Sequence, residues 1–123
     1  MVGGIMGADN SQSSFRRGVM SLVLLGLLKK EDMYGYQLVQ EIERLSGGRI
    51  VTQEGSLYPV LYKLQDQGYV SDRRVKVGKR MMRVYYHLEP AGEVRFLELL
   101  REYEELTCGV FMIVKGDDSC DES

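Results

Sequence analysis

A stretch of eleven residues near the middle of the chain, Glu54 to Leu64, constrains the fold more than any other feature. Its apolar side chains recur three and four residues apart, which predicts one face of an amphipathic helix packed on a core. That core face is formed by Leu57, Val60, Leu61 and Leu64. The opposite face is unusual for a solvated surface, where Glu and Lys are preferred, and it indicates a surface that contacts a partner. It carries Tyr58, Pro59, Tyr62 and Lys63.

A basic hairpin is predicted directly after this helix. Apolar and polar residues alternate in the second of two stretches, residues 69–77 and 82–88, and the spacing predicts two strands around Gly78-Lys79-Arg80. Between Ser71 and Arg83 there are six basic residues and one acidic residue. Helix, basic hairpin and strand in this order predict a winged helix-turn-helix that binds DNA. The expected fold class is α+β and mostly α, with a long C-terminal dimerisation helix.

Two further helices are expected before the amphipathic helix that contains residues 54–64, which we call the recognition helix. Residues 15–28 are apolar around most of the circumference, so this helix is expected to be largely buried. Residues 34–46 form a second helix with Asp32 as its cap, and it buries Leu38, Ile42 and Leu45. Residues 29–33 are expected to form a polar turn between them.

The start of the recognition helix has two candidate caps. Ser56 is preferred, because it places Pro59 at the third helical position, where the missing N–H has no intrahelical acceptor. Thr52 is the other cap and makes Pro59 interior. A short strand is expected over residues 50–52.

The last helix is predicted to begin at Pro90 and to carry more apolar surface than one small domain can cover. A second copy of the same helix would bury the excess. The predicted dimer interface consists of Phe96, Leu99, Leu100, Tyr103, Leu106 and Val110. A possible pocket for a small hydrophobic effector between the subunits would be lined by Phe96, Leu100 and Tyr103.

The charge distribution supports nucleic acid as the partner, although the net charge is −2. Residues 15–90 carry 13 Lys and Arg against 8 Asp and Glu, or +5, and the remaining residues carry 3 against 10, or −7. Phosphate attraction depends on such local fields and not on the total. The expected organisation is a disordered arm (1–14), a winged helix DNA-binding domain (15–90), a dimerisation helix (91–115) and an acidic tail (116–123).

Several other classes of function are disfavoured by the sequence. No apolar run approaches the roughly 18 residues of a membrane span, and no secretory signal is recognisable, so a cytoplasmic protein is expected. Cys108, expected to be a buried thiol, and Cys120, expected to be free, lack metal-ligand spacing. His87 is the only histidine, and no nucleophile–base pair is apparent. We expect no enzyme activity, no metal and no cofactor.

Candidate DNA contacts follow from the predicted helix faces and the hairpin. Lysines and arginines suit phosphates, tyrosine hydroxyls suit phosphates or base edges, and a helix N-terminus can receive a phosphate. Most such contacts position a protein without specifying sequence. The candidates are Tyr36, Ser56, Tyr58, Pro59, Tyr62, Lys63, Lys79 and Arg80. The alternative is a winged-helix protein-interaction module without DNA binding, which uses the tyrosine face for a protein partner; the basic hairpin argues against it.

Four segments together make the chain resemble the PadR family of bacterial transcriptional regulators. They are Tyr34-Gly35-Tyr36-Gln37-Leu38, Gly55-Ser56-Leu57-Tyr58-Pro59, residues 64–70 and residues 85–92. The resemblance, to the short-chain branch with one C-terminal helix, implies a homodimer that binds an inverted-repeat operator, usually as a repressor. It implies that the third helix enters the major groove. Family members commonly have Thr where Glu89 stands, and drug-sensing short members have a ligand-stacking Trp where this chain has Tyr103.

Overall fold

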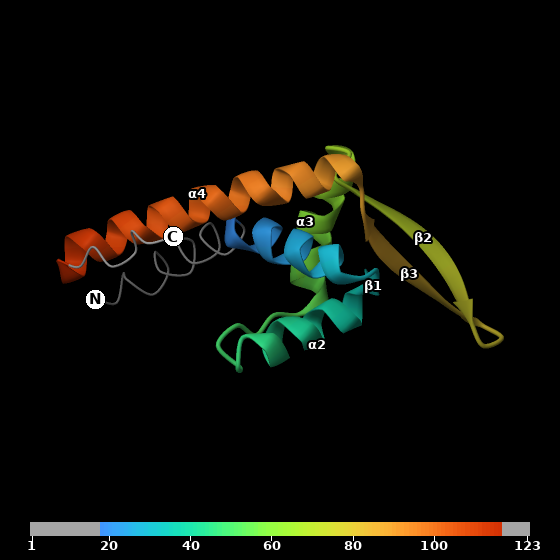
Figure 1. Cartoon of the computed structure of the whole chain (residues 1–123). Helices are drawn as coiled ribbons and strands as arrows, with labels where there is room; N and C mark the ends of the chain where they lie inside the picture. The colour runs from blue at the N-terminus through green and yellow to red at the C-terminus, as the bar shows by residue number, and fades with distance from the viewer. Residues whose placement is uncertain (1–17, 117–123) are drawn as a thin grey trace, which may run out of the picture.

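The computed structural model describes residues 18–116, and Figure 1 shows the arrangement of its elements. The expected arm over residues 1–14 and all but the first residue of the expected acidic tail lie outside this range. Residues 18–30 form a first helix, which is followed by a two-residue strand. In chain order, the elements after the first helix are β1 (Met33–Tyr34), α2 (Gly35–Leu45), α3 (Glu54–Asp66), β2 (Val70–Val77), β3 (Met81–Leu88) and α4 (Pro90–Lys115).

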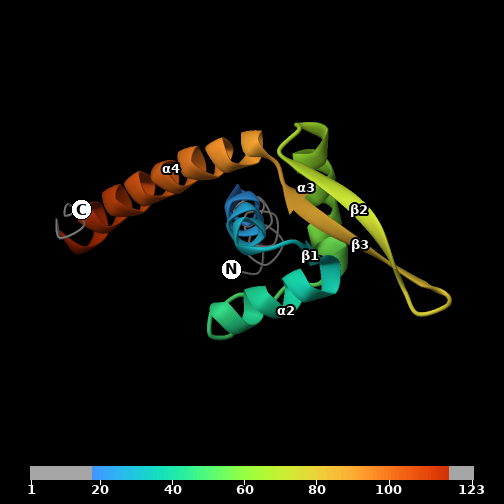
Figure 2. The ribbon, with the colours of Figure 1, turned by 45° about the vertical axis from the view of Figure 1, so that its right-hand side comes forward.

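The three strands form one antiparallel sheet in the order β1-β3-β2. β2 and β3 make a hairpin, which we call the wing, and it is closed by a turn at Gly78, whose φ of +75° suits glycine. β1 pairs with the base of the wing through Met33 opposite Tyr86. The wing and α4 leave the helical core in opposite directions, and the first helix lies between α4 and α2 (Figures 1 and 2).

The core lies where the first helix, α2, α3 and the base of the sheet meet. Leucines dominate it, and the predicted core face of α3 is confirmed, because all four of its apolar residues are buried. α2 contributes Leu38 and Ile42, whereas Leu45 is 48% exposed, so the prediction that Leu45 is buried was wrong. Leu45 occupies the last position of α2, beyond the elements that cover the rest of that face. Five side chains are the most completely enclosed: Leu24, Leu25, Leu38, Leu57 and Leu61.

The start of α3 differs from the prediction. The helix begins at Glu54 with Gln53 as its N-cap, so neither Ser56 nor Thr52 caps it, and Pro59 lies inside the helix. The helix is extended ahead of Ser56 by a tight first turn, in which the Ser56 N–H donates to Gln53 O at 2.9 Å. In a regular helix the N–H of residue 59 would donate to the Gly55 carbonyl, and proline has no N–H with which to do so. Pro59 itself is exposed, so its ring meets solvent on the outer face of α3.

Three predictions about the connections were also wrong. Residues 50–52 form no strand. The segment predicted as a polar turn ends in β1, because Met33 is buried and pairs with β3. Asp32 does not cap α2; Tyr34 holds the N-cap position without a side-chain bond, and the Asp32 carboxylate instead contacts the wing.

The junction between the wing and α4 is close-packed. Pro90 opens α4 as predicted, after Glu89 at the N-cap. The Glu89 carboxylate does not bond the helix terminus but accepts a hydrogen bond from the Ser71 hydroxyl of β2. Gly92 is buried, and an ideal Cβ at this residue would lie 2.2 Å from the carbonyl oxygen of Tyr69. Glycine at residue 92 therefore allows the helix to approach the strand backbone.

Near the far end of α4, Cys108 is half-buried and disulfide-bonded, so the expectation of a buried thiol was wrong. Cys120 lies outside the described residues. No helix within residues 18–116 is long and apolar enough to span a bilayer.

Candidate nucleic-acid interface

The exposed face of α3 carries two stacked tyrosines. The Tyr58 and Tyr62 rings lie 6.1 Å apart between centroids with an interplanar angle of 15°, and Tyr62 is 60% exposed. The Tyr58 hydroxyl donates to Glu54 Oε2 at 3.0 Å. Their spacing of four residues places both rings on the same side of the helix. The predicted face is thus confirmed as an outward surface, with Tyr58 half-buried and Tyr62 open.

Two tyrosines of this region are held in the protonated form. Burial, followed by the hydrogen bond to Glu54, raises the pKa of Tyr58. Burial raises the pKa of Tyr86, which lies on β3, to about 12. Both phenols are therefore neutral near pH 7, and the single O–H of Tyr58 is donated to Glu54.

The wing presents its cations on two different faces. Side chains along a strand alternate between faces, and the register pairs Arg74 with Val84 and Lys76 with Met82. Val84 and Met82 belong to the face that meets α3, so Arg74 and Lys76 lie on that face as well. Lys79 and Arg80 are exposed in the turn at the tip. The cations nearest to α3 are thus on the strands, and the two predicted contacts are farther out.

The opposite face of the wing is fastened to the loop before β1. Arg73 donates to Asp32 Oδ2 at 3.0 Å, and His87 Nδ1 lies 2.8 Å from Asp32 Oδ1. The hydrogen bond with His87 makes the largest contribution to lowering the pKa of Asp32, and Arg73 adds to it. Arg73 also lies over the ring of Tyr85, 5.3 Å from its centroid. Arg73 and His87 therefore hold the base of the wing against the helical core.

A hollow of about 310 Å³ lies between α3, the start of α2 and β3. Arg83 is its cation and stands over the Tyr34 ring at 4.3 Å. Glu54 is the carboxylate of its lining. The complete lining is Tyr34, Gly35, Glu54, Tyr58, Tyr62, Met82, Arg83, Val84 and Tyr86.

The predicted contacts are only partly brought together. Tyr58 and Tyr62 line the hollow beside the wing, while Ser56, Pro59 and Lys63 are exposed on α3 outside it. Tyr36 is 52% exposed on α2. Lys79 and Arg80 are carried beyond the helices by the length of the hairpin (Figure 1).

Glu54 and Arg83 were missed by reasoning from the sequence. An acidic residue at the start of a helix suits the helix dipole and so suggested no other role. Arg83 was counted only as part of the basic run. The alternation of strand β3 places Arg83 and Tyr85 on the face opposite Met82 and Val84, so no local pattern would have placed Arg83 in the hollow, which it reaches by lying over the Tyr34 ring.

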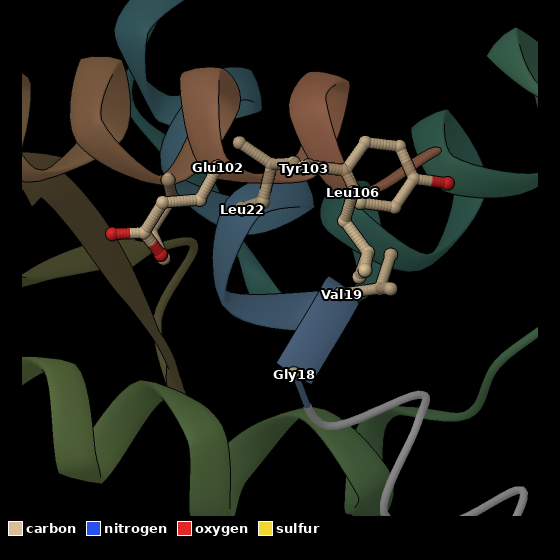
Figure 3. Close-up of a pocket in the computed structure, with 7 residues that line it drawn as sticks. Gly18, Val19, Leu22, Glu102, Tyr103 and Leu106 are labelled. Carbon is tan, nitrogen blue, oxygen red and sulfur yellow. The ribbon is translucent and has the colours of Figure 1, made fainter. Parts of the chain in front are cut away.

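A second concavity of about 270 Å³ lies between the first helix and α4 (Figure 3). Val19 and Leu22 come from the first helix, and Leu99, Tyr103 and Leu106 come from α4. Gly18 and Glu102 complete the lining. Phe96 and Leu100 do not line this groove. Phe96 instead packs on the core, where its Cε1 atom would lie 3.1 Å from a Cβ on Gly26.

α4 exposes many apolar side chains beyond the helical core. In the four consecutive residues from Phe111 to Val114, the exposed fractions range from 42% to 84%. Leu106 and Val110 of the predicted interface are also exposed, at 63% and 45%. Val94 and Leu97 are two more exposed apolar residues near the start of the helix.

Within residues 18–116, no three His, Cys, Asp or Glu side chains are grouped so that they could hold a metal ion.

Comparison with known proteins gives one consistent result. Residues 24–98 match the model of the transcriptional regulator PadR-like family. The transcriptional regulator YqjI of Escherichia coli is 34% identical over 76 residues, covering 62% of this chain and 37% of YqjI. The structure of a transcriptional regulator from Clostridium thermocellum is similar with a TM-score of 0.73 and 28% identity, covering 82% of this chain and 97% of that one.

A further similar structure contains nucleic acid. Bacillus subtilis PadR in complex with operator DNA matches with a TM-score of 0.62 and 27% identity, over 67% of this chain and 47% of that one. The chain thus spans less than half the length of YqjI and of that PadR. These neighbours confirm the predicted winged-helix fold, and the family is one of transcriptional regulators rather than enzymes. The chain belongs to the transcriptional regulator PadR-like family.

Proposed function

We propose that this transcriptional regulator binds an inverted-repeat operator as a homodimer and represses transcription. The observation that carries the proposal is the placement of the α3 tyrosines Tyr58 and Tyr62 and of Arg83 around one hollow, beside the wing face that carries Arg74 and Lys76. A surface with exposed hydroxyls and cations suits a phosphate backbone. A similar fold in Bacillus subtilis PadR was solved with operator DNA, which supports the same partner for this chain.

In this proposal α3 enters the major groove and the wing follows the adjacent backbone. Lys63 neutralises a phosphate, and Ser56 offers its hydroxyl to another. Tyr62, the more exposed tyrosine, contacts phosphate or a base edge. Lys79 and Arg80 at the wing tip contact phosphates farther along the duplex.

The test is DNA binding measured by fluorescence anisotropy over a salt series. The probes are the DNA upstream of the protein's own gene and scrambled DNA of equal length. We expect tight binding to the upstream duplex that persists near physiological salt, and weaker, more salt-sensitive binding to the scrambled one. Equal, weak binding to both would contradict operator recognition at this site and favour a winged-helix module with a protein partner.

The homodimer is supported by the apolar side chains that α4 leaves exposed. Leu106, at 63% exposure, is expected to be covered by the second copy. Two copies would then present two α3 helices to half-sites about 34–36 Å apart. Repression follows if a dimer on such an operator obstructs RNA polymerase, and a reporter driven by the upstream DNA should then become more active when the regulator is absent.

Substitution of Leu106 by Glu tests the dimer. A buried charge at the interface should give a monomer in light scattering, whereas wild type gives a dimer. Leu97→Glu is the matched control, because Leu97 is 59% exposed and lies nine residues, or two and a half turns, away on the opposite side of α4. A dimeric Leu106→Glu protein, or a monomeric wild type, would contradict the proposed interface.

The proposal also includes a small hydrophobic effector that weakens operator binding. Of the predicted lining residues Phe96, Leu100 and Tyr103, only Tyr103 lines the mostly apolar groove between the first helix and α4, and this groove supports an effector site beside Tyr103. Planar hydrophobic compounds should change tyrosine fluorescence and weaken operator binding, and both effects should decrease in Tyr103→Ala. If a panel of such compounds changes neither signal, the effector role is wrong.

A further inference from the structure

Glu54 places a negative charge on the surface proposed to meet DNA. It is the first residue of α3, is half-buried, and its Oε2 atom accepts the Tyr58 hydroxyl at 3.0 Å. The same oxygen would lie 2.7 Å from a Cβ on Gly35, so the carboxylate packs against the start of α2. The carboxylate is therefore held in the hollow between α2, α3 and β3 by contacts with two elements.

No ion pair neutralises this charge within the described part of the chain. Arg83 shares the hollow, but the ion pairs found among residues 18–116 do not include one between Arg83 and Glu54. The carboxylates of Glu54 and Asp72 both contribute to raising the pKa of Tyr86, after burial and the neighbouring phenols. Their field therefore reaches the β3 side of the hollow.

We propose that Glu54 limits the affinity of the protein for the DNA backbone and so keeps sequence-independent binding weak. This inference rests on the DNA-binding function proposed above. Non-specific binding comes almost entirely from phosphate neutralisation, so an uncompensated carboxylate beside the phosphate path opposes it directly. Specific binding also gains from base contacts, which this charge does not remove.

A second possible role of Glu54, recognition of a DNA base, is less favoured than the limitation of backbone affinity. A carboxylate can accept from the amino group of cytosine in the major groove. That role needs a side chain on the outermost surface of α3, with Pro59 and Lys63, both of which are exposed. Glu54 is instead half-buried and turned toward Tyr58 and the start of α2.

The substitution Glu54→Gln tests the inference, because the amide keeps the shape and the acceptor for Tyr58 while removing the charge. The probes are a labelled random-sequence duplex of about one operator length and a duplex selected by the wild-type protein from a random pool. At low salt we expect Glu54→Gln to bind the random duplex about 3- to 10-fold tighter, as two unit charges about 4–6 Å apart in a water-like dielectric imply. The gain should shrink as salt increases.

Glu104→Gln is the control for net charge, since Glu104 is exposed on α4, away from the wing. It should change binding of either duplex by less than about 2-fold, because a distant exposed charge is screened by salt. Thermal unfolding of both variants establishes that each is folded.

The outcomes separate this inference from the proposed function. If wild type prefers the selected duplex and Glu54→Gln binds random DNA no tighter, Glu54 does not limit backbone affinity. Loss of discrimination between the selected duplex and single-base variants in Glu54→Gln would make Glu54 a base reader and overturn the inference as well. If no sequence is enriched from the pool, the proposed operator recognition fails. If neither protein binds any DNA, both are wrong.

Discussion

Replacement of Gly92 by alanine should loosen the joint between α4 and the wing. The new Cβ would lie 2.2 Å from the Tyr69 carbonyl oxygen and 2.6 Å from Leu88 Cδ1. Ordinary contacts between such atoms begin near 3.5 Å, so the helix and the strand backbone must separate by about 1 Å. That carbonyl also accepts the Glu89 N–H at 3.0 Å, so the shift strains a hydrogen bond at the start of α4.

The magnitude follows from two opposing contributions to stability. Overpacking in a rigid environment costs about 1–3 kcal/mol, and no rotamer change can relieve a clash with a backbone atom. Alanine regains about 1 kcal/mol over glycine inside a helix. Because the backbone cannot yield, we take the upper end of this cost, and after the gain from alanine the net loss of unfolding free energy is about 2 kcal/mol, which corresponds to a fall of about 8 °C in Tm.

Gly109→Ala in the same helix is the matched control. Apart from its chain neighbours and the backbone of its own helix, no atom of residues 18–116 lies within 4 Å of a Cβ at Gly109, so only the helix propensity changes, and Tm should rise by about 4 °C. Both variants and wild type are melted by circular dichroism at one protein concentration. A Gly92→Ala protein as stable as wild type would refute the close approach of helix and strand from which the magnitude was worked out.

Four other substitutions test the core, the loop before β1 and the wing tip. Leu61→Ala removes a fully buried side chain and should cost about 2–5 kcal/mol in urea denaturation; a loss below about 1 kcal/mol would contradict its place in the core. The pKa of Asp32 is lowered below 3.8, so the stability that Asp32 contributes is present above that pH and is lost as the pH falls through the lowered value. Asp32→Asn should therefore be less stable than wild type at pH 7, by up to about 1 kcal/mol for partly exposed partners, and the difference should vanish in acid; a constant difference would point to another cause. Lys79→Ala or Arg80→Ala should weaken binding to all DNA sequences and reduce the magnitude of the log–log salt slope by about 0.9 for each phosphate that is no longer neutralised, and an unchanged slope in both would remove the wing tip from the interface.

The order and type of the main elements could be predicted because they depend on local patterns. The helical spacing of Leu57, Leu61 and Leu64, the alternation in β3 and the turn at Gly78 each specify an element whatever its surroundings. Pro90 likewise marked the start of the last helix. The core face of α3, the wing and α4 were all recovered from these signals.

The predictions that failed depend on contacts between distant segments. Asp32 looks like a helix cap in sequence, but the tertiary structure brings Arg73 and His87 to its carboxylate from strands more than forty residues away. β1 consists of two residues, too short for a periodic signal, and exists because β3 supplies its hydrogen-bond partners. The start of α3 moved because a tight first turn preceded Ser56.

The amino-acid sequence by itself therefore determined the elements, the family resemblance and the concentration of basic charge in one hairpin, since each is written in neighbouring residues. Tertiary structure alone decided which face of the wing meets α3 and which face is held by Asp32. Arg73 and Arg74 are adjacent in the chain, yet the alternation of the strand assigns the first to Asp32 and the second to the face beside the hollow. The same packing brought Glu54 against the start of α2, a contact between segments that no local pattern joins.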